Sequence, residues 1–181
     1  MKKLLIIGCA RSGTLFTSEA LQKQGLDIGH EVMGADGMVS WFATFEDCCI
    51  LPKEHLPSVS HTSFFILHQV RHPLRVISSA VTLTAKSWRR ICARVPEITL
   101  EESLLLRCMK YWYYWNQIAE AVASMTYRVE TFNGRRAEDV ATDTNHREHR
   151  ELDWVSLHEQ YPVLCEKIQR LSTRYGYRES M

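Results

Sequence analysis

The sequence predicts an α/β fold, a three-layer sandwich in which a central parallel sheet of about four or five strands lies between helices. Two observations favour this class. A continuous apolar run stands near the amino end, and strand-like segments then alternate with helix-like segments along the chain. With 181 residues, 45% of them hydrophobic, the chain suits a single domain, 1–181, that has a real core.

The first half of the chain supplies two clear strand signals. Residues 4–8, LLIIG, form an uninterrupted apolar run that is typical of a strand buried on both faces, and a helix is expected over 13–23. A short strand is plausible within 26–32. The segment 63–71, SFFILHQVR, predicts a central strand, after which Pro73 can open another helix.

The second half is mostly helical. Residues 100–125 carry apolar side chains around most of the helix circumference, which predicts a covered helix, and 126–132 alternates like a further strand. A last helix is expected from about 154 to 175, ended by Gly176. The polar segment 133–151 predicts a surface loop, either mobile or closing over a ligand.

Composition narrows the possible partners and the setting. A charged fraction of 24% and a net charge of +1 give no sign of a nucleic-acid-binding surface. The run at 4–8 is too short to cross a bilayer and leads into a glycine loop rather than a cleavage site, so we expect a cytoplasmic protein without a membrane anchor. The six cysteines form no CxxC pair, which favours reduced core thiols over disulfides or a zinc site.

The segment GCARSGT, which joins the first strand to the first helix, has the spacing of a phosphate-binding loop. Gly8 and Gly13 match the pattern G-x-x-x-x-G-K-[ST], but Thr14 and Leu15 stand where the lysine and the magnesium-binding hydroxyl belong. The strand at 63–71 also lacks an aspartate at its carboxyl end to hold magnesium. We therefore expect a P-loop NTPase-like fold whose loop binds an anion without a metal. A glycine turn that only joins strand to helix is the alternative interpretation.

A second group of candidate anion-binding residues follows the central strand. RHPLRVISS places Arg71 at the end of that strand, and Pro73 at the start of a helix that carries Ser79 about two turns later. An arginine and a serine in these positions are suited to bind one phosphate together.

The loop and this second group together resemble the cofactor site of the sulfotransferase family that uses 3′-phosphoadenosine 5′-phosphosulfate. The chain is similar to a short member of bacterial or phage type, although Ala10 replaces the family's proline and Leu15 its usual second hydroxyl. YRVETF and the carboxyl-terminal region show a weaker likeness. The resemblance implies that the loop grips the 5′-phosphosulfate and that Arg71 and Ser79 grip the 3′-phosphate. The implied cofactor-binding residues are Arg11, Ser12, Gly13, Thr14, Leu15, Arg71, Ser79, Asn145 and Arg147.

The same resemblance implies the reaction, which is transfer of a sulfuryl group to an acceptor hydroxyl or amine by metal-independent in-line displacement. A sulfuryl group carries one negative charge where a phosphoryl group carries two, so hydrogen bonds and cationic side chains can suffice without magnesium. Arg11 and Thr14 are then expected to hold the sulfonate and its leaving oxygen. The acceptor class stays open among small molecules, sugars and lipids.

The candidate base lies in GLDIGHEVM, near the carboxyl end of the second strand, where open α/β sheets place their chemistry. His30 and Glu31 are neighbours, and strand side chains alternate between faces, so we expect one of them to reach the cleft. Their placement shortly after the first helix resembles the branches of the family that use glutamate. Glu31 is therefore the predicted base, and His30 is its orienting neighbour or the base itself.

Two other functions and one structural question stay open at this point. The chain is also suited to be a nucleotide-binding module without catalysis or, less favoured by the missing lysine and aspartate, a small-molecule P-loop kinase. The aromatic residues Trp112 and Trp115 have helical spacing typical of a core. Trp41 and Phe42 fit either a core or an acceptor pocket.

Overall fold

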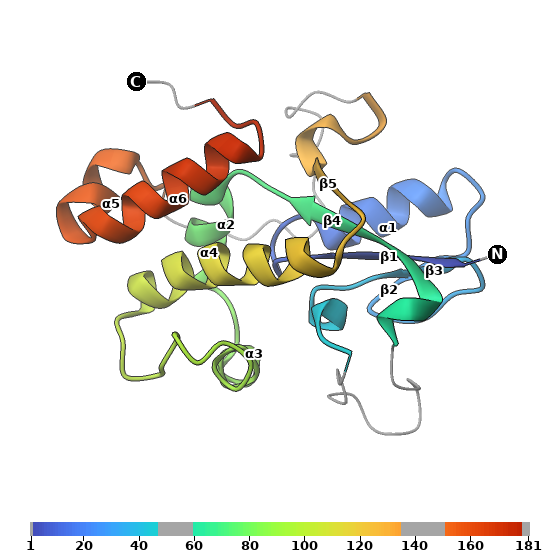
Figure 1. Ribbon diagram of the computed structural model, residues 1–181, viewed down its shortest axis with the longest axis horizontal. Helices are drawn as coiled ribbons and strands as arrows, with labels where there is room; N and C mark the ends of the chain where they lie inside the picture. Colours follow the sequence, from blue (N-terminus) through green and yellow to red (C-terminus); the bar gives the residue numbers. More distant parts are fainter. Residues whose placement is uncertain (1, 47–59, 135–150, 179–181) are drawn as a thin grey trace.

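The computed structural model describes residues 2–46, 60–134 and 151–178. In these ranges the chain forms a five-stranded sheet in the order β2-β3-β1-β4-β5, and every neighbouring pair is parallel (Figure 1). The α/β class and the parallel sheet are thus confirmed. The strands are β1 (Lys3–Gly8), β2 (Ile28–His30), β3 (Gly37–Val39), β4 (Phe64–Val70) and β5 (Met125–Arg128).

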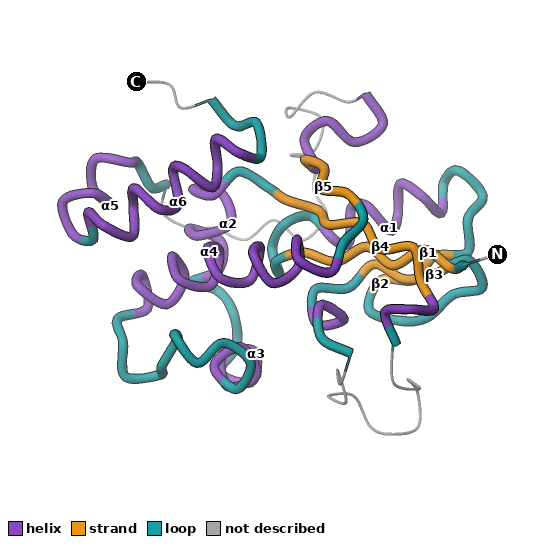
Figure 2. The backbone as a smooth tube through the Cα atoms, in the orientation of Figure 1, coloured by secondary structure: helices purple, strands orange, loops and turns teal. Residues whose placement is uncertain are grey.

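The helices gather mainly at the side of the molecule away from the amino terminus, as Figure 2 shows. They are α1 (Thr14–Gln22), α2 (Pro73–Ala80), α3 (Ala85–Cys92), α4 (Leu104–Val122), α5 (Trp154–Gln160) and α6 (Pro162–Arg174), with short 3₁₀ turns η1 (Phe42–Thr44), η2 (His61–Ser63) and η3 (Val129–Gly134). No helix of the described residues is long and apolar enough to cross a bilayer.

The central strand β1 has a core on each of its faces. Ile6 packs with Leu21 of α1 on one face, whereas Leu5 and Ile7 join a larger core with α2, α4 and α6 on the other. Successive strand residues point to opposite faces, so a strand covered on both sides must be apolar at every position. This explains the continuous run LLIIG and is compatible with a three-layer arrangement.

The larger core is built on the aromatic residues of α4. Trp112 and Trp115 are fully buried there, and the Trp115 ring lies 5.5 Å from that of Trp41. Trp41 and Phe42 are buried as well, which settles them as core residues. The core interpretation of the α4 aromatics is therefore confirmed for these tryptophans.

Some predicted boundaries are wrong for identifiable reasons. The expected single helix over 154–175 is two helices, because Pro162 opens α6 and disfavours helical geometry at Tyr161, whose φ and ψ are −141° and 62°. The short strand β3 was not predicted, since three residues are too few to show a period. The strand expected over 126–132 becomes a 3₁₀ turn after Arg128.

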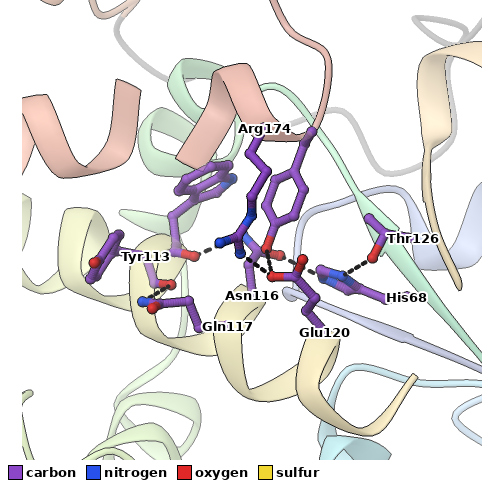
Figure 3. A network of polar contacts seen from close by, with 9 residues as sticks. His68, Tyr113, Asn116, Gln117, Glu120, Thr126 and Arg174 are labelled. Carbon is purple, nitrogen blue, oxygen red and sulfur yellow. Dashed lines mark hydrogen bonds and ion pairs between the residues drawn. The ribbon is translucent and has the colours of Figure 1, made fainter. Parts of the chain in front are cut away.

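A buried polar network joins β4, β5 and α4 at their contact (Figure 3). The fully buried His68 bonds Thr126 Oγ1 through Nδ1 and Asn116 Oδ1 through Nε2, both at 3.1 Å. Asn116 Nδ2 donates to the Trp112 carbonyl, so its Oδ1 accepts, and Nε2 of His68 therefore carries the proton. Burial lowers the pKa of His68 to about 4. His68 is thus a buried side chain with both ring nitrogens hydrogen-bonded.

Candidate functional site

The strand connections place a candidate site at the carboxyl ends of β1 and β4. After β1 the chain crosses through α1 to β2 on one side of the sheet, and after β4 it continues through α2, α3 and α4 to β5 on the other. Open α/β sheets bind their ligands at the carboxyl ends of two neighbouring strands whose following connections run in opposite directions. The predicted loop, 8–14, lies at this point.

Both glycines of the loop are required by its geometry. Gly8 pairs with Gln69 across the β1–β4 ladder, and a Cβ at Gly8 would lie 2.3 Å from the Gln69 carbonyl oxygen. Gly13 has φ of 90°, a left-handed conformation, and a Cβ there would lie 3.1 Å from Val129 Cγ2. Glycine relieves both constraints, so the conformation of the loop requires glycine at both positions.

The loop ends at a helix amino terminus that no side chain caps. Gly13 is the N-cap residue of α1, it offers no side-chain bond, and the first turn carries no acidic residue. The first N–H groups of an α-helix lack intrahelical partners and carry a partial positive charge. The N–H groups of Thr14 and Leu15 belong to this turn, which makes it suited to an anion.

Ser12 adds a buried hydroxyl to the loop. The residue is 1% exposed, and within the described chain its Oγ has no hydrogen-bond partner. An unsatisfied buried hydroxyl costs about 1–3 kcal/mol, so a ligand that accepts a hydrogen bond from Ser12 would remove this cost. A Cβ placed on Gly8 would come within 3.2 Å of this oxygen, so Ser12 Oγ lies against the start of the loop.

Arg11 connects the loop to the second predicted group. Its Nε donates to Ser79 Oγ of α2 at 3.0 Å, and its carbonyl accepts a hydrogen bond from Arg71 Nη1 at 3.1 Å. The structure therefore brings Arg11, Arg71 and Ser79 together, although Ser79 receives this hydrogen bond from Arg11 and not from Arg71. Arg71 and Ser79 follow Arg11 by 60 and 68 residues in the sequence, and both are hydrogen-bonded to it.

The half-buried Arg71 lies near the opposite charge of Glu130. Burial lowers the pKa of Arg71, and the nearby charge of Glu130 opposes that effect. Glu130 is held in place because its Oε1 accepts from the His72 N–H at 2.9 Å and its Oε2 from Tyr177 Oη at 2.7 Å. An arginine stays protonated in proteins, so Arg71 presents a fixed positive charge beside the loop.

His30 and Glu31 approach the loop from the end of β2. His30 Nε2 lies 3.1 Å from Thr14 Oγ1 and 3.9 Å from Glu31 Oε1. His30 therefore contacts the loop directly, whereas Glu31 lies beside His30. Glu31 follows the last residue of β2 and has φ of 59°, so the strand alternation no longer separates the two side chains.

The pKa of His30 depends on its burial and on two nearby carboxylates. Burial lowers the pKa of His30, while the charges of Glu31 and Glu19 oppose that effect. His30 is therefore neutral near pH 7 and able to accept or donate through one nitrogen. Burial lowers the pKa of Arg90 in α3, and the nearby charge of Glu31 opposes that effect.

Backbone conformation independently distinguishes two of the three predicted catalytic residues. Among the described residues, Arg11 and Glu31 are the non-glycine residues with positive φ, at 73° and 59°. This conformation costs about 1–2 kcal/mol for an ordinary residue, and such strain clusters at functional sites. Neither the loop pattern nor the family resemblance contains this information.

Three further residues support the loop and were not predicted. The fully buried Gln69 donates to Ser12 O at 2.8 Å, and the hydroxyl of Tyr111 accepts from the Ala10 N–H at 2.6 Å. Glu130 faces Arg71, as described above. A polar residue inside the apolar run of β4 was the one available signal for Gln69.

Asn145 and Arg147 lie outside the described residues. In the described ranges, no group of three or more histidine, cysteine, aspartate or glutamate side chains is placed to hold a metal ion. Comparison with protein-family models, with curated proteins and with solved structures found no match to this chain.

Proposed function

We propose that this chain is a sulfotransferase with a P-loop-like anion site, which moves a sulfuryl group from 3′-phosphoadenosine 5′-phosphosulfate to an acceptor hydroxyl or amine. The observation that carries the proposal is the bridge made by Arg11, which bonds Ser79 through its side chain and Arg71 through its carbonyl. The two sequence elements that resemble one cofactor site are in direct contact, which supports the proposal.

The residues at the loop fit a ligand with two anionic groups. The uncapped start of α1 and the unpartnered Ser12 hydroxyl suit the phosphosulfate end. Arg71 directly follows β4, and Ser79 lies in the second turn of α2. Both residues suit the 3′-phosphate. The cofactor supplies a sulfuryl group that is already activated by its bond to phosphate, so the protein need only bind, orient and stabilise charge.

Each catalytic side chain then has a defined task. Glu31 takes the proton from the acceptor as the acceptor oxygen or nitrogen bonds to sulfur, and His30 holds the Thr14 hydroxyl in position. Arg11 stabilises the negative charge that collects on the phosphate side as the sulfur–oxygen bond breaks. The left-handed backbone of both Arg11 and Glu31 supports this assignment, because such strain clusters at functional sites.

The first test is a calorimetric titration with the product nucleotide, 3′-phosphoadenosine 5′-phosphate, beside ATP with magnesium. We expect the bisphosphate to bind and Arg71→Ala to weaken it by about 1–2 kcal/mol or more, as for the loss of a charged hydrogen bond. Arg170→Ala, on the exposed surface of α6, removes the same charge and should leave binding unchanged.

The outcomes separate the three functions. Binding of ATP with magnesium in place of the bisphosphate would refute the proposal and favour a kinase. Binding of the bisphosphate, followed by transfer to none of a panel of phenol, sugar, lipid and amine acceptors, would favour a nucleotide-binding module. Transfer that Glu31→Gln abolishes would support the enzyme.

A further inference from the structure

Gln69 occupies the position directly beneath the anion-binding loop. It is fully buried near the carboxyl end of β4 and pairs with Gly8, the first residue of the loop. The loop comes so close to β4 that a Cβ on Gly13 would lie 3.7 Å from Gln69 Nε2. A polar side chain at such a place must either be fully satisfied or carry a large penalty.

Both ends of the Gln69 amide are engaged by different parts of the fold. Nε2 donates to the Ser12 carbonyl at 2.8 Å, while Oε1 accepts from Tyr127 Oη at 2.7 Å and from Thr17 Oγ1. The reverse orientation would set two acceptor oxygens, Oε1 and Ser12 O, against each other. The amide therefore has one orientation, with its N–H toward the loop.

The bond to Ser12 O fixes the direction of the next N–H. The described peptide bonds are all trans, and a trans peptide points its C=O and N–H in opposite directions. When Gln69 holds Ser12 O, the N–H of Gly13 must point away from Gln69, on the side where α1 begins. Arg71 holds the carbonyl of Arg11 in a comparable way.

We propose that Gln69 is a positioning residue that sets the affinity of the loop for its anion by fixing the Ser12–Gly13 peptide. The inference rests on the proposed function, because it concerns the same loop. It also assigns a reason to the amide. A carboxylate at this strand end is the group that holds magnesium in P-loop enzymes, whereas here it would repel Ser12 O and add negative charge beneath the anion.

The sharpest test is Gln69→Glu, which keeps the shape and the acceptor for Tyr127 and Thr17 but replaces the donor. The ratio of its dissociation constant for 3′-phosphoadenosine 5′-phosphate to that of the wild type is measured near pH 8 and near pH 6. We expect a ratio of about ten or more near pH 8. Near pH 6 the ratio should fall at least about threefold, because burial raises a carboxyl pKa and the protonated acid can donate to Ser12 O.

Tyr127→Phe is the matched control. It removes one of the two hydroxyls at Oε1 and leaves the Ser12 bond in place, so its binding should stay within about twofold of the wild type. A Gln69→Glu ratio near one at both pH values would refute the inference. A raised ratio that does not change with pH would assign Gln69 a merely structural role and would refute it equally.

A second readout does not depend on the identity of the nucleotide. The chain has 8 glycines, so selective ¹⁵N-glycine labelling gives few amide resonances, and sulfate is titrated as the probe. The Gly13 resonance should shift in the wild type and respond much less in Gln69→Glu. If the wild type bound no bisphosphate, the proposed function would fail while this titration still decided the inference. A Gly13 resonance in the wild type that does not respond to sulfate would overturn it.

Discussion

Acidification should reveal how much stability the buried His68 contributes. His68 has a pKa of about 4 in the folded protein, against an ordinary value of 6.5. The unfolded chain therefore binds more protons than the folded one between these values, so stability is complete above about pH 6.5 and is lost as pH falls toward 4. For a group that is fully buried, this loss amounts to about 2.5 kcal/mol near pH 4.5.

The assay is urea denaturation of the wild type and of His68→Gln, near pH 7 and near pH 4.5. Glutamine retains one donor for Asn116 and one acceptor for Thr126, but it does not titrate. His30 and His72 also have a lowered pKa from burial, so they add to the acid loss in both proteins and cancel in the difference between them.

We expect the variant to be less stable than the wild type near pH 7, by about 1–2 kcal/mol. The gap should close or reverse near pH 4.5, with a relative movement of the urea midpoints of about 1 M for a slope of about 2 kcal/mol/M. If the difference in stability between the two proteins were the same at both pH values, His68 would not be a buried neutral imidazole in the folded state, and the reasoning from burial would be wrong.

Three further predictions concern the loop and the catalytic pair. Arg11→Ala should lower turnover by about two orders of magnitude, the scale of losing one transition-state donor, and near-normal turnover in a single-turnover assay would remove Arg11 from this role. Glu31→Gln should abolish transfer, and loss of activity in His30→Ala but not in Glu31→Gln would reverse the assignment of the base. Glu31→Gly should be equally inactive yet no less stable to unfolding than the wild type, since glycine accepts φ of 59° without strain. Tyr111→Phe leaves the buried Ala10 N–H without its acceptor and should cost about 1–3 kcal/mol in thermal or urea unfolding, whereas Tyr114→Phe, which lies half-buried on the same helix, serves as the control.

The local patterns of the sequence were sufficient for most elements of the fold. LLIIG and SFFILHQVR predicted β1 and β4 within one residue at each end, and the apolar circumference of 100–125 predicted α4. These elements are covered by other layers, so the burial of each residue follows from its own hydrophobicity. The loop was likewise predictable, because the spacing of Gly8 and Gly13 is a property of adjacent residues.

The sequence by itself determined which chemical groups the candidate site contains, whereas the tertiary structure decided how they are joined. No local pattern shows that Arg11 bonds both Ser79 and Arg71, that Gln69 holds the Ser12 carbonyl, or that Glu31 turns beside His30 in a left-handed conformation. The three hydrogen bonds connect residues 57 to 68 positions apart, and their geometry follows from the packing of β1, β4 and α2. Periodicity and spacing report on neighbours along the chain, while the positions of buried polar groups depend on the whole fold.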